Sequence, residues 1–183
     1  MALVEKWNRS INLVSRQDIG RLLSRHILDS LSVNKYMHGS KILNIGTGAG
    51  FPGVPLALVN PQRTFTLCDR MAKRIRFLQV VKSQLQLSNV ELLEQDFSAK
   101  NRNTGSVDTI VARAVAPAAV LWPVLEPSLA EGGRMLLFTS TQAPEPESVA
   151  VAAKVDPPYC GRTETVDIPG LQQPHYVEIL ERH

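Results

Sequence analysis

Apolar side chains in the first forty residues recur three and four positions apart, which is the spacing of amphipathic helices. The pattern predicts one helix over Ala2–Leu13 and a second over Asp18–Met37. The apolar positions of the second helix are Leu22, Leu23, Ile27, Leu28 and Leu31. We therefore expect residues 1–40 to form a helical segment that packs on the domain after it.

From residue 41 onward, short β-type runs alternate with helical stretches. The predicted strands are Lys41–Ile45, Thr64–Cys68, Asn89–Leu93, Val107–Ala112 and Arg134–Thr139. The predicted helices lie near Pro52–Val59, Ala72–Leu87 and Pro117–Leu129. A Pro-rich stretch at Ala143–Glu147 follows and leads to a possible helix. Two closing strands are predicted after it, at Thr163–Ile168 and Tyr176–Leu180. The alternation predicts one α/β domain with a mostly parallel sheet over residues 41–183.

Composition narrows the class of protein. Hydrophobic residues make up 44% and charged residues 20%, as in ordinary globular proteins. No apolar run has the length of a membrane span, and the N-terminus lacks a signal-peptide pattern, so we expect a cytoplasmic protein without membrane contact. Cys68 and Cys160 have no metal-ligand spacing, so neither a disulfide framework nor a metal site is predicted.

Positive charge is concentrated near the N-terminus. Residues 1–41 hold seven Lys/Arg and three Asp/Glu, whereas the rest hold thirteen and fourteen. This asymmetry favours a polyanionic partner, which basic side chains would position through its phosphates. The candidate side chains are Arg16, Arg21 and Arg25, with Lys73, Arg74 and Arg76. A solvated helix face is the alternative.

Glycine occupies every second position after the first strand, at Gly46, Gly48 and Gly50. Glycines permit a tight turn and let a ligand approach bare backbone at the carboxyl end of a strand. A dinucleotide fingerprint from Gly46 would need glycine at Phe51, and one from Gly48 starts too far beyond the strand. The acid-x-Gly-x-Gly-x-Gly loop of S-adenosylmethionine enzymes fits in register. A nicotinamide cofactor and a turn without ligand remain alternatives.

Two polar residues flank this loop. Asn44 stands where the acid of the S-adenosylmethionine loop is usual, and we expect its amide to face the cofactor's ammonium group. Asp69 ends the second strand, where a carboxylate can accept two hydrogen bonds from a ribose diol. A helix N-cap would give Asp69 the same position.

Five stretches combine into a specific pattern. They are Trp7-Asn8 with Asn12-Leu13, Arg25 to Leu31, Gly46 to Ala57, Asp69 with Lys73 to Leu78, and Ala112-Arg113-Ala114. Together they resemble the glucose-inhibited division protein B family. The resemblance implies a Rossmann-like class I methyltransferase fold that uses S-adenosyl-L-methionine to methylate guanine N7 in the 530 loop of 16S ribosomal RNA.

The same resemblance implies site residues and partners. It places the cofactor against Gly46 and Phe51, the Phe97-Ser98 turn and Arg113. It adds Asn12 and His26 to the residues expected to contact RNA. The implied partner is 16S ribosomal RNA or the small ribosomal subunit, and we expect a monomer.

The sequence departs from the family pattern in three places. Asn44 replaces the usual acid, and Phe138-Thr139-Ser140 stands where Leu-Lys-Gly is usual, which removes a basic residue near the site. The chain also begins where family members have a further helix. The alternatives are therefore another nucleic-acid or small-molecule methyltransferase, or a cofactor-binding RNA-interaction protein with reduced catalysis.

Arg113 is the residue we expect to act at the catalytic site. It lies at the carboxyl end of the fourth strand and is the only charged residue between Asp108 and Glu126. An unpaired charge there is costly, so a partner is implied: the cofactor carboxylate, the guanine edge or an RNA phosphate. The structural alternative is a salt bridge to an acid such as Asp108 or Asp96.

The chemistry implied by the resemblance needs few catalytic groups. Guanine N7 carries a free in-plane lone pair, so methyl transfer to it requires alignment and desolvation, without a general base. Good alignment alone corresponds to an effective molarity of roughly 10⁵–10⁸ M. The lack of a Ser/His/Asp or Cys/His constellation is compatible with this reaction.

One tetrapeptide, Asp156-Pro157-Pro158-Tyr159, spells the motif of amino-group DNA and RNA methyltransferases. In those enzymes the motif follows the fourth strand, where this chain has Ala112 to Pro117. Here the tetrapeptide follows the fifth strand, among turn residues, so we interpret it as a loop.

Overall fold

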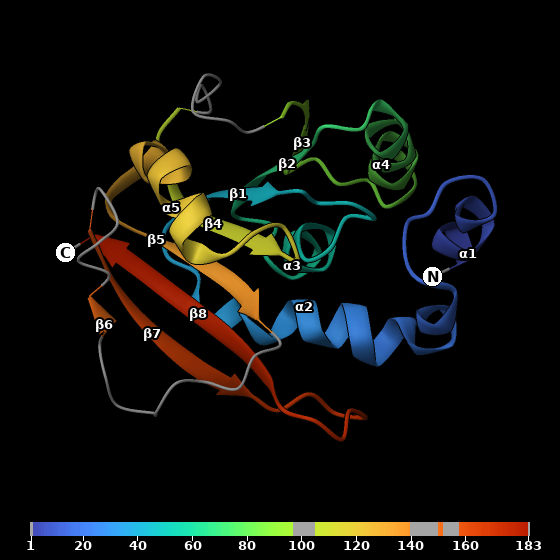
Figure 1. Ribbon diagram of the computed structural model, residues 1–183. Helices are drawn as coiled ribbons and strands as arrows, with labels where there is room; N and C mark the ends of the chain where they lie inside the picture. The colour runs from blue at the N-terminus through green and yellow to red at the C-terminus, as the bar shows by residue number, and fades with distance from the viewer. Residues whose placement is uncertain (1, 97–104, 140–149, 152–157, 183) are drawn as a thin grey trace.

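The computed structural model describes residues 2–96, 105–139, 150–151 and 158–182 (Figure 1). Its centre is an eight-stranded sheet with the order β3-β2-β1-β4-β5-β8-β7-β6. The strands are β1 (Lys41–Ile45), β2 (Thr64–Asp69), β3 (Val90–Glu94), β4 (Val107–Arg113), β5 (Leu129–Thr139), β6 (Ala150–Val151), β7 (Tyr159–Val166) and β8 (His175–Arg182). Of Arg16, Ala150 and Val151 only the backbone is described.

The strand directions confirm a mostly parallel sheet closed by a hairpin. Strands β1 to β5 pair in parallel, β5 pairs antiparallel with β8, and β7 and β8 form the predicted hairpin. The strand order reverses between β1 and β4, which lie side by side. In open α/β sheets this reversal point, at the carboxyl ends of the strands, is where ligands bind.

Helices and shorter helical turns surround the sheet. They are α1 (Ala2–Asn8), η1 (Arg16–Arg21), η2 (Leu23–Leu28), α2 (Asp29–Ser32), η3 (Asn34–Tyr36), α3 (Gly53–Val59), α4 (Ala72–Gln84), α5 (Ala118–Leu125) and η4 (Glu126–Ser128). None of them, in the part of the chain that is described, has the length and apolar character needed to cross a bilayer.

The N-terminal helices differ from the prediction. The first ends at Asn8 instead of Leu13, because the Asn8 side-chain oxygen accepts hydrogen bonds from the amides of Leu13 (2.8 Å) and Val14 (3.0 Å) and turns the chain. The second is not one α-helix: 3-10 turns in η1 and η3 enclose a π-helical turn, η2, and one α turn, α2. Gly20, a weak helix former, lies within η1, the first part of this irregular stretch.

Two predicted strands, β5 and β7, have clearly different bounds, and one short strand was not predicted. β5 begins at Leu129, earlier than predicted, because Gly132 adopts a positive φ of 71° and lets the chain bend while it continues to pair with β4. β7 begins at Tyr159 and ends at Val166, and Ala150–Val151 adds the strand β6. The Pro-rich stretch Ala143–Glu147, with the start of the helix predicted after it, lies outside the described residues.

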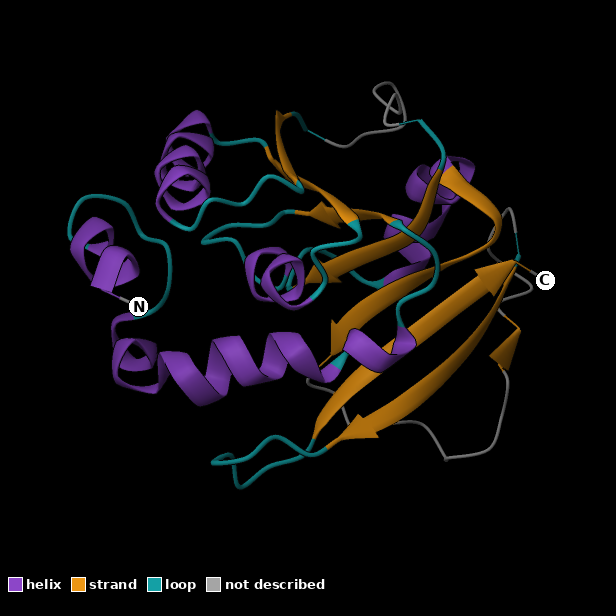
Figure 2. Ribbon diagram, turned by 180° about the vertical axis from the view of Figure 1, so that it is seen from behind, coloured by secondary structure: helices purple, strands orange, loops and turns teal. Residues whose placement is uncertain are grey.

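Two apolar clusters fill the two faces of the sheet. One joins β-sheet side chains to α3, α4 and the N-terminal segment, including the buried Val4, Leu22 and Val33. The other joins the sheet to α5 through Leu121 and Trp122. Figure 2 shows the N-terminal helical turns running beside α3 on their face of the sheet. Burial of each such side chain contributes about 1.5–3 kcal/mol.

Candidate functional site

The glycine loop after β1 is open to a ligand at one position. Gly46, Gly48 and Gly50 all have positive φ (59°, 57° and 90°), a region that L side chains rarely adopt. A Cβ placed on Gly48 would meet nothing within 4 Å except the Gly46 carbonyl oxygen, at 3.9 Å. A ligand can therefore approach the bare backbone at Gly48.

The other glycines are required by packing within the protein. A Cβ on Gly46 would lie 2.7 Å from Val115 Cγ2, and one on Gly50 would lie 2.9 Å from Leu78 Cδ2 on α4. A Cβ on Gly53, at the start of α3, would collide with a leucine of β2. These residues let the loop and α3 lie close to the sheet, whereas Gly48 leaves space.

Asn44 is wholly buried and positions this loop. Its Oδ1 accepts hydrogen bonds from Thr47 Oγ1 (2.8 Å) and from the Gly53 amide (3.0 Å). Its Nδ2 donates to the carbonyl oxygens of Val111 (3.2 Å) and Ile45 (3.3 Å). The expected contact with a cofactor ammonium group does not fit this geometry, because both ends of the amide are used inside the protein.

Asp69 lies at the end of β2, next to the open side of the loop, and is 3% exposed. Its Oδ2 accepts from the Gly48 amide (2.9 Å) and from Arg74 Nη1 (3.1 Å). Its Oδ1 accepts from the Met71 amide (2.9 Å) before α4. The carboxylate thus joins the glycine loop to α4.

Arg113, His26 and Phe51 form a second cluster at the end of β4. The Arg113 guanidinium lies over the Phe51 ring, 5.3 Å from its centroid, and His26 stacks on the same ring at 5.1 Å. Arg113 Nη2 donates to His26 Nδ1 at 2.9 Å. Phe51, expected to contact the cofactor, is 9% exposed and is covered by these two side chains.

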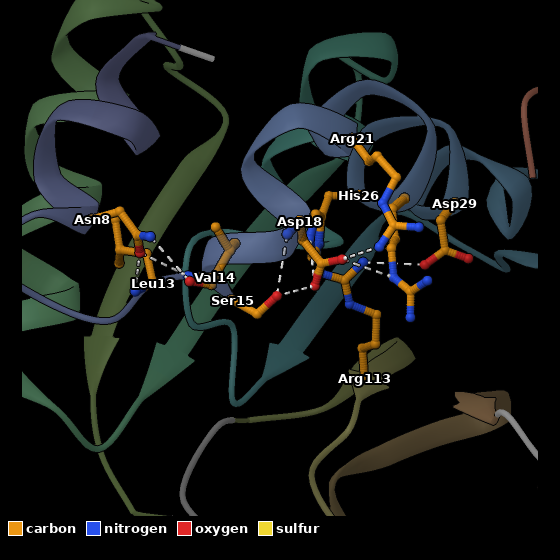
Figure 3. Close-up of polar contacts among 10 residues, drawn as sticks. Asn8, Leu13, Val14, Ser15, Asp18, Arg21, His26, Asp29 and Arg113 are labelled. Atoms are coloured by element: carbon orange, nitrogen blue, oxygen red, sulfur yellow. Dashed lines mark hydrogen bonds and ion pairs between the residues drawn. The ribbon is translucent and has the colours of Figure 1, made fainter.

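Asp29 is the ion-pair partner of Arg113 (Figure 3). Asp29 Oδ2 accepts from Arg113 Nη1 at 3.1 Å, and its Oδ1 lies 2.8 Å from His175 Nδ1 on β8. Burial lowers the pKa of Arg113, and the Asp29 carboxylate opposes that shift. Three segments far apart in the sequence therefore meet at one buried carboxylate.

The partner of Arg113 differs from the acids that sequence reasoning considered. Asp96 is exposed, and Asp108 accepts a hydrogen bond from the Lys41 amide at 2.9 Å, which lowers the pKa of its carboxyl. Asp29 lies within a stretch that carries the family resemblance, which was the available signal for it. His175 had none, because it stands 146 positions from Asp29.

The His26 ring is neutral near pH 7. Burial, and then the Arg113 charge, lower its pKa from 6.5 to about 4. Because Nδ1 accepts from Arg113, the ring proton lies on Nε2, which has no hydrogen-bond partner among the described residues. The nearest carboxylate oxygen, Asp18 Oδ2, is 4.0 Å away.

Four of the basic residues expected to contact RNA are exposed, namely Arg21, Arg25, Lys73 and Arg76, and the first two are ion-paired. Arg21 and Arg25 share one carboxylate oxygen of Asp18, at 3.4 and 3.2 Å, with 52% and 45% of their side chains exposed. Lys73 and Arg76 are exposed on α4. Arg74, from the same predicted cluster, is paired with the carboxylate at the end of β2 instead.

Asn12 is exposed and lies at a pocket of about 590 Å³ beside α1. The other lining residues are Glu5, Asn8, Arg9, Ser10 and Ile19. The lining residues include neither the glycine loop nor Asp69, so this pocket is separate from the candidate cofactor site.

The Phe97-Ser98 turn, Ser140 and Asp156-Pro157 lie outside the described residues. Tyr159, which ends the tetrapeptide, was expected in a loop but begins β7. It packs on Trp122, with ring centroids 5.3 Å apart, and is 8% exposed. A tyrosine used in the core in this way is not available to stack on a nucleobase.

Among the described residues, no group of His, Cys, Asp and Glu could hold a metal ion.

Comparison with known proteins confirms the predicted resemblance and fold. The family model GidB, described as rRNA small subunit methyltransferase G, matches residues 1–156. Ribosomal RNA small subunit methyltransferase G of Yersinia pseudotuberculosis is 44% identical over 114 residues, 62% of this chain and 55% of that protein. Its counterpart in Coxiella burnetii is 33% identical over 180 residues, 98% of this chain and 84% of that protein. The chain thus spans about half the length of the Yersinia relative.

A solved structure supports the fold independently. A SAM-dependent methyltransferase from Aquifex aeolicus superposes with a TM-score of 0.62, covering 90% of this chain and 95% of that one. The sequence identity is 18%, so this likeness concerns the fold.

Proposed function

Because this chain belongs to the rRNA small subunit methyltransferase G family, we propose that it transfers a methyl group from S-adenosylmethionine to guanine N7 in the 530 loop of 16S ribosomal RNA. The observation that carries the proposal is the open backbone at Gly48, next to the Asp69 carboxylate, where the strand order reverses. We propose a cytoplasmic monomer that acts on the small ribosomal subunit or its RNA.

The cofactor site we propose combines the open space at Gly48 with the carboxylate of Asp69 beside the loop. Gly48 provides room for the ligand against bare backbone, and Asp69 offers carboxylate oxygens to the ribose hydroxyls. Asn44 contributes by holding the loop in this shape. We propose that Phe97 and Ser98, which lie outside the described residues, add further contacts to the cofactor.

The chain's own task in the reaction is positioning. When bound, the cofactor supplies an electrophilic methyl group on its sulfonium. Guanine N7 needs no general base, which agrees with a His26 ring that is neutral and hydrogen-bonded to Arg113. A guanidinium has five N–H donors. Within the described part of the chain, Asp29 and His26 take two of these donors from Arg113, and we propose that the others serve the guanine edge, a phosphate or the cofactor carboxylate.

Exposed basic side chains supply the proposed RNA contacts. Arg21, Arg25 and Lys73 would meet phosphates, which position the RNA without reading its sequence. The exposed Asn12 is the polar group that we propose to lie toward the same RNA, whereas the Nε2 proton of His26 is buried beneath that surface.

The cofactor site is tested by the binding of S-adenosylhomocysteine. At a hundredfold excess over its Kd, the ligand should raise the free energy of unfolding by about 2.7 kcal/mol. Gly48→Val should abolish the shift in Tm, because a branched side chain fills the open space at that position. A titration with NADH, which should release no heat of binding, separates this site from that of an oxidoreductase. An undiminished shift in Gly48→Val would refute the site assignment.

A cofactor-binding RNA-interaction protein with reduced catalysis is the second candidate. The observation that favours it is the Asp29 carboxylate, which already neutralises Arg113. Methyl incorporation into under-methylated small subunits decides between the two. We expect transfer by the parent chain, severe loss in Arg113→Ala and incomplete rescue in Arg113→Lys, because lysine lacks the planar fork. No transfer by a chain that binds both cofactor and RNA would favour the second candidate.

A further inference from the structure

The carboxylate of Asp69 has almost no capacity left for a ligand. A carboxylate offers about four lone-pair sites, two on each oxygen. Arg74 Nη1 and the Gly48 amide use both sites of Oδ2, and the Met71 amide uses one site of Oδ1. A ribose diol that donates two hydrogen bonds needs two sites, so one of the present donors has to leave.

Of the three donors, the guanidinium is the one that can move. The Gly48 and Met71 amides are backbone groups held by the glycine loop and by the entry to α4. Arg74 reaches Asp69 from the first turn of α4 on a long side chain that is 32% exposed. A partly exposed ion pair is weak and is screened by salt, so its exchange for another partner costs little.

We propose that Arg74 guards the ribose position of Asp69 and is displaced when S-adenosylmethionine binds. This inference rests on the proposed function. The displaced guanidinium remains on α4 beside the exposed Lys73 and Arg76, where it adds a positive charge to the proposed RNA surface. Cofactor binding thereby strengthens RNA binding, and by reciprocity RNA strengthens cofactor binding.

Calorimetric titration with S-adenosylhomocysteine, without RNA, tests the guard directly. Arg74→Ala should bind the ligand about two- to fivefold more tightly than the parent at low salt, the range that a partly exposed ion pair spans. The advantage should shrink as salt rises, because screening weakens the ion pair in the parent chain. Arg74→Met is the companion variant, since it keeps the apolar stem and removes every donor.

Arg76→Ala is the matched control. Arg76 is exposed, lies two positions further along α4 and makes no ion pair with any residue in the described ranges. Its removal lowers the charge of the helix by the same amount and should leave the affinity for S-adenosylhomocysteine unchanged. A gain in affinity shared by Arg76→Ala would attribute the effect to net charge and overturn the guard.

A second titration, with a single-stranded RNA oligonucleotide, tests the coupling. Saturating S-adenosylhomocysteine should tighten RNA binding by the parent and leave that of Arg74→Ala unchanged. Equal or weaker ligand binding by both Arg74 variants, with normal binding by the parent, overturns the guard and leaves the proposed function intact. Binding by the variants alone supports the guard, and binding by none of these proteins overturns both.

Discussion

Two buried carboxylates, Asp69 and Asp29, are each 3% exposed and each paired with an arginine at 3.1 Å. They differ in where their partners come from. Arg74 stands five positions from Asp69, whereas Arg113 and His175 stand 84 and 146 positions from Asp29. The Asp69 pair is built by a short stretch of chain, and the Asp29 pair by the assembled fold.

The difference also concerns exposure. The Arg74 side chain is 32% exposed and can exchange its partner with a ligand, while the Arg113 side chain is 19% exposed and is enclosed by Phe51 and His26. Two ion pairs of equal length can therefore serve different purposes. The local pair suits an exchangeable contact, and the long-range pair joins the N-terminal segment to the sheet.

The largest expected effect on stability comes from the removal of Arg113, and the separate removal of Arg74 is the comparison. Arg113→Met should lower the free energy of unfolding by about 3 kcal/mol, because it leaves the buried Asp29 charge without its cation. Arg74→Met should lower it by less than about 1 kcal/mol, because Asp69 keeps two amide donors. Urea denaturation measures both, and equal losses in the two variants would contradict the comparison.

The next largest effect on stability should come from Asn44, whose side chain holds the glycine loop beside Asp69. Asn44→Leu should lower the free energy of unfolding by about 2–3 kcal/mol, since it leaves the Gly53 amide and the Thr47 hydroxyl without their acceptor. Urea denaturation against the exposed Asn12→Leu, which should change little, provides the measure. A loss no larger than that of Asn12→Leu would show that the loop holds its shape without the amide.

A smaller effect is expected from pH on the Asp29 side. The pKa of His26 in the folded chain is about 4, below its ordinary value of 6.5. Stability from the neutral ring is therefore fully present above pH 6.5 and is lost as the pH falls toward 4. The loss should reach about 1–2 kcal/mol by about pH 5, because one unit of pKa shift corresponds to about 1.4 kcal/mol. His26→Gln should lack this part of the pH profile in denaturation experiments, and an unchanged profile would exclude His26 as its source.

The smallest effect on stability should come from Arg21→Ala/Arg25→Ala. Both ion pairs with Asp18 are exposed, so their loss should cost less than about 1 kcal/mol. RNA binding is the sensitive readout, because each lost phosphate contact should reduce the slope of log affinity against log salt by about 0.7–0.9. An unchanged affinity and slope would identify these arginines as a solvated helix face.

Sequence periodicity predicted most of the sheet because strand and helix patterns are local. β1 has the predicted bounds, and Arg113 lies at the carboxyl end of β4 as expected. The N-terminal segment was less predictable. Apolar spacing indicated helix, but the Asn8 side chain ended the first helix early and the second changed from 3-10 to π and α turns. Side-chain hydrogen bonds and tertiary contacts overrode the periodic pattern there.

By itself, the sequence determined the positions of the glycine loop, of Asp69 and of Arg113, since positive φ at glycine and strand alternation depend on nearby residues. The tertiary structure decided which groups these residues meet. It turned Asn44 inward, gave Asp69 the guanidinium of Arg74, and brought Asp29 and His175 to Arg113. The physical reason is that a buried charge takes whichever counter-charge the packed chain brings within reach, and for Arg113 that group lies 84 positions away.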